Sequence, residues 1–480
     1  MQTSVCEYLT NQANSSLHSS FTWEQKFVQI IKNSRHTVEI TELTPEGQGL
    51  ATLAGLPVIV EQTIPGEVVE IKIIKVTGRL AVGKLNRVVK PAQERAMPFC
   101  PVFQRCGGCS LQHIRYGAQL ALKTEMFKDS LQNIGQRENV VIHDMLGMPQ
   151  PLHYRNKAQY PVGRQKGAAV IGFYANRSHE IIEHPACAVQ AESLDRVKAV
   201  FEDFMVRSRL SVYDEERQEG LIRYLMLRVG MYTGEIMVMI VVNGNDFPGR
   251  KLLIQALTAA VPEIRSVVLN VNERHTNVIL GPKYKVVYGQ DAITDQLGGC
   301  QFVISPQSFY QVNPAQTEVL YRKIVEYAGL HGKETVVDLY SGIGTIALFL
   351  ARQAQHVYGV ENVPDAVNDA RRNAKINSNK NVHFISGDAA QVMTELNEQG
   401  VRADVVVLDP PRKGCDARVL QTLVRTPPAR IVYVSCNPAA LAIDLRYLNE
   451  HGFRAAEVQP VDMFPHTAHV ECVVSIERRK

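Results

Sequence analysis

The stretch Thr335–Gly344, which reads TVVDLYSGIG, decides the fold of the C-terminal part of the chain. Its first half is rich in valine, as is typical of a buried strand, and a turn with two glycines follows at once. Glycines between a strand and a helix let a ligand approach the backbone and let the helix pack closely on the sheet. The stretch therefore predicts a strand, a ligand-binding turn and the start of a helix.

From about residue 311 onward, strand and helix patterns alternate regularly on both sides of this stretch. Further apolar strands are expected at 356–360, 382–385, 404–408 and 431–434, and helical patterns fill the gaps. Such alternation is typical of a doubly wound α/β sheet. We find no internal repeat.

The rest of the chain divides into three further segments, since 480 residues suggest about three domains. Residues 1–31 form an extension, and 32–92 contain several short strands with turns, which predicts a small β-barrel. Residues 93–310 form a mixed α+β middle domain. In that domain we expect a helix at 116–134 and strands at 154–162, 224–230 and 235–242.

Composition leaves the partner open. Fifty-two Lys and Arg against 48 Asp and Glu give a net charge of +4, which permits nucleic-acid binding without demanding it. The most apolar run, Ile236–Val242, is far shorter than the ~18 residues of a membrane span. Met1–Ser20 lacks the features of a signal peptide, which predicts a cytoplasmic protein. In a reducing compartment, clustered cysteines favour metal binding or catalysis over disulfides.

Two basic stretches are candidate nucleic-acid surfaces. The last strands of the barrel carry six cations against Glu67 and Glu70. The six are Lys72, Lys75, Arg79, Lys84, Arg87 and Lys90. Tyr154–Lys157, followed by Arg164 and Lys166, could clamp phosphates or stack on unpaired bases. Ordinary solvated surface charge is the alternative for both stretches.

The expected sheet gathers candidate cofactor ligands at the carboxyl ends of its strands, where such sheets bind ligands. Gly342 and Gly344 form the turn. Glu361 ends the second strand and could accept hydrogen bonds from ribose hydroxyls. Asp388 closes the third strand, where it could meet an adenine. Helix capping is the alternative for both acids. The absence of a third glycine favours a nucleoside without pyrophosphate over NAD, and S-adenosylmethionine fits.

Three motifs bring a carboxylate, a thiol and a second carboxylate to the same edge. Asp409 opens Asp-Pro-Pro-Arg, Cys436 lies in Ser-Cys-Asn-Pro, and Glu471 follows His469-Val470. A buried lone cysteine is usually inert. Cys436 differs because it ends a strand in a polar turn that faces the expected cofactor, where a nucleophile would be presented. For Glu471, an ordinary surface charge on a strand is the alternative.

A separate group of cysteines has metal-ligand spacing. Cys100, Cys106 and Cys109 follow the pattern C-x5-C-x2-C with glycines between the last two, and the distant Cys187 could complete a four-thiolate site. From the spacing alone, zinc and an iron–sulfur cluster are comparable, and unliganded thiols are the alternative.

These motifs, with Phe309–Asn313 (FYQVN) ahead of the glycine turn, resemble the S-adenosylmethionine-dependent RNA uracil-5-methyltransferase family. The resemblance covers nearly the whole chain beyond the first ~30 residues. It implies a Rossmann-like class I methyltransferase domain at 311–480 and, for 32–92, an OB-like TRAM barrel that binds RNA.

The resemblance also implies roles for single residues. Cys436 would add to carbon 6 of uracil, Glu471 would remove the proton from carbon 5, and Asp409 would position cofactor or target base. The cofactor contacts that match the family are Gln311, Tyr340, Glu361, Asp409 and Asp388.

The branch of the family that combines a TRAM domain with an iron–sulfur cluster is the one most similar to this chain. It implies a [4Fe–4S] cluster, with Cys187 at the matching position, and 23S ribosomal RNA as the substrate of a monomeric enzyme. The target uridine would be flipped from a loop into the pocket. Transfer RNA is the rival substrate. A cytosine-5 RNA methyltransferase and a non-catalytic RNA-binding iron–sulfur sensor are rivals of other classes.

Overall fold

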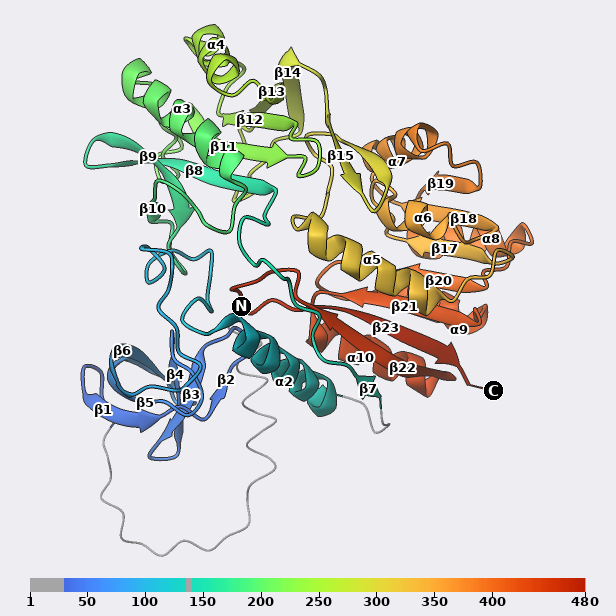
Figure 1. Ribbon diagram of the computed structural model, residues 1–480, viewed down its shortest axis with the longest axis horizontal. Helices are drawn as coiled ribbons and strands as arrows, with labels where there is room; N and C mark the ends of the chain where they lie inside the picture. Colours follow the sequence, from blue (N-terminus) through green and yellow to red (C-terminus); the bar gives the residue numbers. More distant parts are fainter. Residues whose placement is uncertain (1–29, 135–139, 480) are drawn as a thin grey trace, which may run out of the picture.

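The computed structural model describes residues 30–134 and 140–479, so most of the predicted extension 1–31 lies outside the described residues (Figure 1). Three sheets follow one another along the chain, joined by helices and one separate hairpin. Among the described residues, no helix is both long enough and apolar enough to cross a membrane.

The first sheet is the expected barrel. Its strands are β1 (Arg35–Glu39), β2 (Glu42–Leu43), β3 (Gly49–Leu53), β4 (Leu56–Val60), β5 (Val68–Val76) and β6 (Ala81–Lys90), in the order β1-β5-β6-β4-β3-β2. The buried positions of β5 alternate, so Val69, Ile71 and Ile73 fill the interior. Glu67, which the sequence placed among the surface charges, is instead buried and pairs with Arg95 at 2.5 Å.

The second sheet lies in the middle segment. Its order is β10-β9-β8-β11-β12-β13-β14. The strands are β8 (Lys157–Gln165), β9 (Ala168–Tyr174), β10 (Ile181–Glu183), β11 (Ile222–Val229), β12 (Ile236–Val242), β13 (Ile264–Val271) and β14 (Lys283–Gly289). Helices α3 (Glu192–Ser208) and α4 (Arg250–Ala260) pack on one face. Met226, Met237 and Met239 point to the other face and join the core of the C-terminal domain, so the run 236–242 is a doubly buried strand.

The third sheet is the expected doubly wound one, in the order β19-β18-β17-β20-β21-β23-β22-β7. Its strands are β17 (Thr335–Leu339), β18 (His356–Glu361), β19 (Val382–Ser386), β20 (Val405–Leu408), β21 (Arg430–Ser435), β22 (Phe453–Val461) and β23 (Glu471–Arg478). The helices are α5 (Pro314–Ala328), α6 (Thr345–Leu350), α7 (Pro364–Ile376), α8 (Ala389–Glu398), α9 (Ala417–Arg425) and α10 (Pro438–Glu450). Strands β17 to β21 are parallel and β23 is antiparallel to β21. All five strands expected in this region are therefore confirmed. The hairpin of β15 (Ile293–Leu297) and β16 (Cys300–Ile304) precedes this sheet.

One part of the predicted middle segment packs elsewhere. Helix α2 (Tyr116–Ile134) buries Phe127 and Leu131 in the same core as Leu441 and Leu445 of α10. Strand β7 (Val141–Ile142) pairs with β22 and extends the C-terminal sheet. Residues 93–310 are thus distributed over the second sheet, the β15–β16 hairpin and the C-terminal sheet, and Figure 1 shows α2 beside α10 and β22.

Candidate active site

The glycine turn after β17 has the backbone that its sequence predicts. Tyr340, Gly342 and Gly344 all have positive φ, at 68°, 55° and 84°. A side chain at Gly344 would meet the ring of Phe384 at 2.5 Å, whereas one at Gly342 would point into open space. Gly344 is therefore needed for packing, and Gly342 leaves room for a ligand.

Glu361, the last residue of β18, faces this turn. Its carboxylate accepts a hydrogen bond from the amide of Gly342 at 3.0 Å and another from the amide of Val363 at 2.9 Å. Helix α7 is capped by Val363, so Glu361 does not act as the N-cap. Each oxygen keeps a free lone pair for a hydroxyl donor.

Asp388 is engaged differently. It is the N-cap of α8, where its carboxylate accepts from the amide of Gln391 at 3.1 Å, and it forms an exposed ion pair with Arg418 at 2.9 Å. The capping alternative thus describes what Asp388 does in this structure. Any contact with an adenine would be additional to both bonds.

Two buried polar side chains beside the turn, those of Asp338 and Ser341, have oxygen atoms without a regular hydrogen bond in the part of the chain that the structure describes, although the backbone of Ala347 lies close enough to Asp338 to lower its pKa. Within the described residues, no hydrogen bond of normal geometry reaches either carboxylate oxygen of Asp338. The same holds for the hydroxyl of Ser341. Burial raises the pKa of Asp338 well above its usual value, and the charge of Asp409 adds to the rise. Unpartnered buried polar atoms next to the open space at Gly342 fit a ligand with several donors, such as the nucleoside and amino-acid groups of S-adenosylmethionine. The sequence interpretation assigned no role to either residue.

Gln311 lies on the segment that leads into α5. Its backbone oxygen accepts a hydrogen bond from the side chain of Asn156 at 3.0 Å, and the residue is buried. Two residues on, Asn313 caps α5. The Phe-Tyr-Gln-Val-Asn motif is therefore fixed to the middle sheet on one side and to α5 on the other.

Strand pairing brings Cys436 and Glu471 together. In the antiparallel pair β21–β23, the last residue pair is Ser435 opposite Cys472. Cys436 directly follows Ser435 and Glu471 directly precedes Cys472, so both residues adjoin this end of the ladder. Burial and the charge of Glu471 both raise the pKa of Cys436. Asp409 directly follows the neighbouring strand β20. The three residues that the sequence singled out for chemistry thus share one point at the carboxyl edge of the sheet.

The electrostatics of the three groups are linked. Burial raises the pKa of Glu471 to about 8, with Asp409 adding to the rise and Arg412 opposing it. Burial also raises the pKa of Asp409 to about 7. The pKa of Cys436 is raised to about 11 by burial and by the charge of Glu471, while Arg412 lowers it. Arg412 is therefore a cation placed to favour the Cys436 thiolate.

Arg412 was overlooked in the sequence although it stands in the Asp-Pro-Pro-Arg motif. The side chain of Asn437 fixes this loop, because it donates to the backbone oxygen of Arg412 at 2.8 Å while its own oxygen caps α10. Asn437 thereby holds the loop that carries Arg412 against the turn that carries Cys436.

A test of this coupling uses Glu471→Gln. Removing the carboxylate charge lowers the pKa of Cys436, so iodoacetamide should alkylate Cys436 about 3-fold faster at pH 9, measured on its peptide by mass spectrometry. Glu477→Gln, at the exposed end of the same strand, is the control and should leave the rate unchanged. Equal rates in both variants would contradict the coupling.

The four predicted metal ligands also meet. Cys100, Cys106, Cys109 and Cys187 line one cavity of about 200 Å³. Burial raises the pKa of Cys109 to about 12, and the charges of the other three thiols act in the same direction. Over residues 30–134 and 140–479, no group of three or more His, Cys, Asp or Glu is arranged to hold a metal ion.

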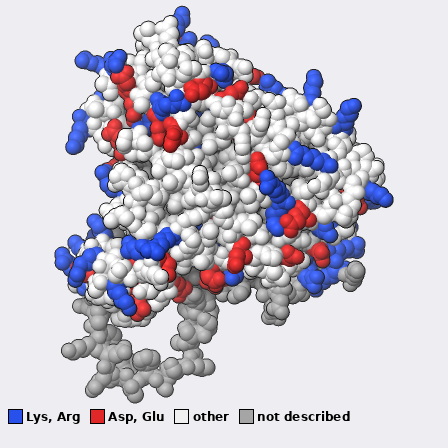
Figure 2. All heavy atoms as spheres, viewed as in Figure 1, with Lys and Arg blue, Asp and Glu red and all other residues white. Residues whose placement is uncertain are grey.

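The prediction that Tyr154–Lys157 forms an exposed RNA clamp is wrong for two of its residues. Tyr154 is 4% exposed and Asn156 1%, because both bond to the C-terminal half of the chain. Arg164 and Lys166 are exposed at the β8–β9 turn, as expected. Figure 2 shows further Lys and Arg gathered over the barrel sheet.

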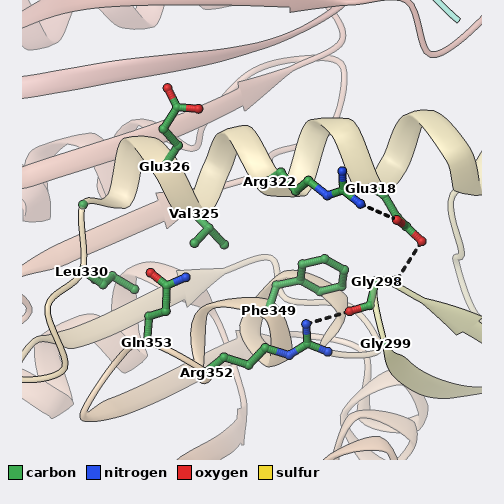
Figure 3. Close-up of a pocket in the computed structure, with 11 residues that line it drawn as sticks. Gly298, Gly299, Glu318, Arg322, Val325, Glu326, Leu330, Phe349, Arg352 and Gln353 are labelled. Carbon is green, nitrogen blue, oxygen red and sulfur yellow. Dashed lines mark hydrogen bonds and ion pairs between the residues drawn. The ribbon is translucent and has the colours of Figure 1, made fainter.

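A further cavity lies away from these residues. It has a volume of about 690 Å³ and is bordered by one side of α5, by the end of α6 and by the β15–β16 turn (Figure 3). Its charges are engaged internally, since Arg322 pairs with Glu318 and Arg352 donates to the backbone oxygen of Gly298. No predicted site residue lines it.

Comparison with known proteins agrees with this geometry. The family described as tRNA (Uracil-5-)-methyltransferase matches residues 254–479, and the TRAM domain family matches residues 32–85. A protein of Halalkalibacterium halodurans described as an uncharacterized RNA methyltransferase is 47% identical over 446 residues, or 93% of this chain and 97% of its own. An equivalent protein of Staphylococcus aureus is 44% identical over 449 residues, covering 92% and 98%.

One solved structure is similar over most of this chain. The tRNA (uracil-54, C5)-methyltransferase of Pyrococcus abyssi, in complex with S-adenosyl-L-homocysteine, has a TM-score of 0.74 and 27% identity, covering 92% of this chain and 100% of its own. The chain therefore belongs to the S-adenosylmethionine-dependent RNA methyltransferases of the uracil-5-methyltransferase family.

Proposed function

We propose that the protein methylates carbon 5 of a uridine in RNA through a covalent adduct with Cys436. The observation that carries the proposal is that Cys436 and Glu471 both adjoin the last residue pair of β21–β23, with Asp409 at the end of the neighbouring strand β20 and the glycine turn at the same sheet edge. A nucleophile and a base on either side of one small site suit addition followed by proton removal.

The residues of the chain would act in sequence. The Cys436 thiolate, favoured by Arg412, adds to carbon 6 and pushes electron density onto carbon 5, which becomes nucleophilic. Bound S-adenosylmethionine supplies an electrophilic methyl group. Glu471 then takes the proton from carbon 5, and the electrons of that C–H bond re-form the ring double bond as the thiolate leaves carbon 6. A carboxylate whose pKa is about 8 is a stronger base than an exposed one, which suits this step.

For the cofactor, we propose Gln311, Tyr340, Gly342, Gly344, Glu361 and Asp409 as contacts, with Asp388 as a peripheral one. Gly342→Ala tests the turn, because the new methyl group would enter the open space there. We expect S-adenosylmethionine binding to weaken by at least about 10-fold in calorimetry. Gly400→Ala is the control, since Gly400 also has positive φ and open surroundings and should show the same small loss of stability with normal binding.

For the cysteine cavity, we propose a [4Fe–4S] cluster held by Cys100, Cys106, Cys109 and Cys187. The cavity holds four thiols together with Arg155 and Lys157, and no acidic residue lines it. Such a lining suits an anionic metal–thiolate group. Anaerobically purified protein should be brown and contain iron and sulfide. Colourless protein with stoichiometric zinc would overturn this assignment.

For the substrate, we propose 23S ribosomal RNA in the cytoplasm, on the basis of the TRAM domain and the four cysteines together. Transfer RNA is the second candidate, and it is supported by the similarity to a tRNA enzyme over 92% of this chain. In both cases the uridine must leave its stack to reach a site beneath the loops.

Incubating the protein with separated ribosomal and transfer RNA and labelled S-adenosylmethionine distinguishes the candidates. RNA from cells without the gene serves as substrate, and mass spectrometry of nucleosides and fragments identifies the product. Methyluridine in 23S RNA is the expected result. Methyluridine in transfer RNA alone would show that transfer RNA is the substrate instead. Methylcytidine without methyluridine, or no product, would overturn the proposed activity.

A further inference from the structure

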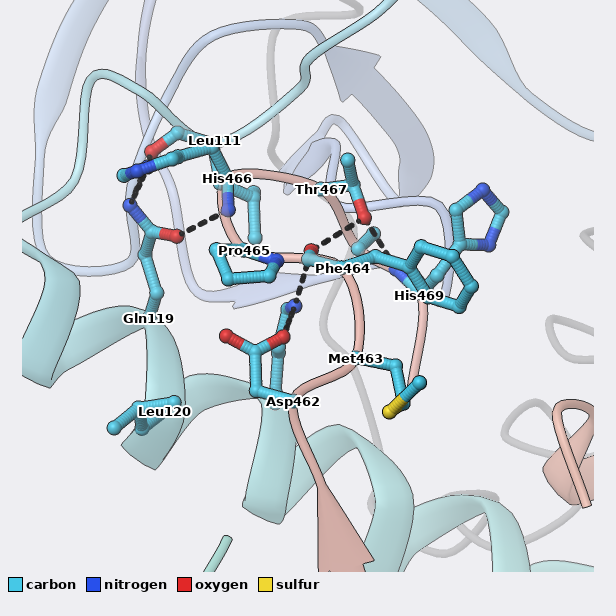
Figure 4. A network of polar contacts seen from close by, with 12 residues as sticks. Leu111, Gln119, Leu120, Asp462, Met463, Phe464, Pro465, His466, Thr467 and His469 are labelled. Carbon is cyan, nitrogen blue, oxygen red and sulfur yellow. Dashed lines mark hydrogen bonds and ion pairs between the residues drawn. The ribbon is translucent and has the colours of Figure 1, made fainter. Parts of the chain in front are cut away.

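The loop 462–470 joins β22 to β23 and ends directly at Glu471. Much of its support comes from residues more than 300 positions earlier in the chain (Figure 4). Four contacts tie this loop to the start of α2, to the segment after Cys109 and to Tyr154.

The first contact is a buried ion pair. The ammonium of Lys123 lies 2.6 Å from the carboxylate of Asp462, and both side chains are fully buried. Lys123 also donates to the backbone oxygen of Phe464 at 3.2 Å, and the hydroxyl of Tyr116 donates to the second oxygen of Asp462 at 2.8 Å. A buried pair with this many bonds holds one geometry, because breaking it would leave an uncompensated charge.

The second contact is made by Gln119 on the same helix. Its amide oxygen accepts from the backbone amide of His466 at 3.1 Å, and its amide nitrogen donates to the backbone oxygen of Leu111 at 3.0 Å. Gln119 thus joins the loop to the segment that follows Cys109, as Figure 4 shows.

The third contact comes from that segment itself. The backbone amides of Ser110 and Leu111 both donate to the backbone oxygen of His466 at 2.9 Å. The hydroxyl of Ser110 accepts from the amide of Ala468 at 3.1 Å. Ser110 immediately follows Cys109, so a displacement of that cysteine would be transmitted to the loop.

The fourth contact comes from the other side of the cysteine cavity. The hydroxyl of Tyr154 donates to the backbone oxygen of Pro465 at 3.0 Å, and Tyr154 directly precedes Arg155, which lines the cavity. The ring of Phe99, the residue before Cys100, packs edge-on against His466 at 5.0 Å. The cavity and the loop therefore share supporting residues.

We propose that these contacts form a clamp that positions Glu471, and that the four-cysteine segment controls the last step of the reaction through it. The clamp is defined as Ser110, Gln119, Lys123 and Tyr154 with the loop 462–470. The inference rests on the proposed function, in which Glu471 removes the proton from carbon 5.

Cys436 is held by other means. It follows β21, and its neighbour Asn437 caps α10 and bonds to the backbone of Arg412. Loosening the clamp should therefore disturb the base without disturbing the nucleophile. The covalent adduct would still form and receive its methyl group, but it would break down slowly.

The variants Tyr154→Phe and Lys123→Met/Asp462→Asn test the clamp. The first removes one hydroxyl, and the second removes both charges together, so that neither is left unpaired. Lys128→Met is the matched control, because Lys128 forms a partly exposed ion pair on the same helix with Glu125.

We expect the RNA–protein adduct on denaturing gels to rise at least about 5-fold and methyluridine turnover to fall about 10-fold in the clamp variants. Alkylation of Cys436 should rise by no more than the about 3-fold expected for Glu471→Gln, because the nucleophile stays in place, and hydrogen exchange in peptides covering 462–470 should accelerate. Equal losses of adduct and product, or unchanged exchange, would overturn the proposal.

Cys109→Ser extends the test to the cysteine segment. We expect faster exchange at 462–470 and the same accumulation of adduct. Unchanged exchange there would show that the cavity does not act through the clamp. The exchange and alkylation measurements need no RNA, so they remain decisive even if the wild-type protein forms no methyluridine and the proposed function fails.

Discussion

Cys436→Ala should abolish methyl transfer: we expect kcat to fall by at least about 1000-fold, because uracil carbon 5 is a poor nucleophile without the thiolate on carbon 6. No RNA–protein adduct forms. S-adenosylmethionine binding, measured by calorimetry, stays within about 2-fold of the wild type, since the glycine turn is separate from the β21 turn.

Cys300→Ala is the control for this experiment. Cys300 is also buried, but it lies on the β15–β16 hairpin and contacts Arg352, away from the sheet edge. Its variant should keep full activity. Full methyl transfer by Cys436→Ala would show that the covalent route is wrong.

Glu471→Gln should stop the reaction at a later stage. The thiolate can still add and carbon 5 can still be methylated, but the amide cannot accept the carbon 5 proton. We expect turnover to fall by about 1000-fold while a methylated RNA–protein adduct accumulates to about one per protein. Labelled methyl groups migrating with the protein on a denaturing gel measure this directly. An adduct-free, equally inactive variant would assign Glu471 to an earlier step.

The same substitution should stabilise the protein, more at high pH than at low pH. The pKa of Glu471 is about 8 in the folded state against a usual value of 4.5. The stability that Glu471 contributes to the folded state is therefore fully present below pH 4.5 and is lost as the pH rises through 8. Glutamine does not ionise, so the variant does not lose this stability. Its gain in the free energy of unfolding should be on the order of 2 kcal/mol larger at pH 9 than at pH 6. Glu477→Gln, which is exposed, should show no such difference.

Local sequence patterns were enough to predict the sheet that carries the site. The valine-rich run at 335–339 and the helical pattern at 116–134 coincide with β17 and α2. The motifs at strand ends also predicted which side chains meet, because parallel strands end at one edge. Asp388 shows the limit of such reasoning. An acidic residue before a helix has the same sequence pattern whether it caps the helix or binds a ligand, and Asp388 caps α8.

Long-range partners could not be predicted in this way. Lys123 and Asp462 are 339 positions apart, and nothing near either residue specifies the other. Tyr154 has the composition of an RNA-binding surface, yet its hydroxyl bonds to Pro465 and its ring is buried. Periodicity reports whether a residue faces inward, but the identity of the facing element depends on the packing of the whole chain.

The sheet order has a consequence for biosynthesis. Strand β23 inserts between β21 and β22, and it is the last strand of the described chain to be made. Helix α2 and strand β7 leave the ribosome more than 300 residues before their partners α10 and β22. Their apolar faces therefore stay unpacked until those partners are made, because these contacts join residues far apart in the sequence. In the proposed mechanism, a nascent chain that lacks β23 would contain Cys436 but not Glu471, the residue proposed as the base. We therefore expect a partly synthesised enzyme to be unable to release any RNA that it attacks.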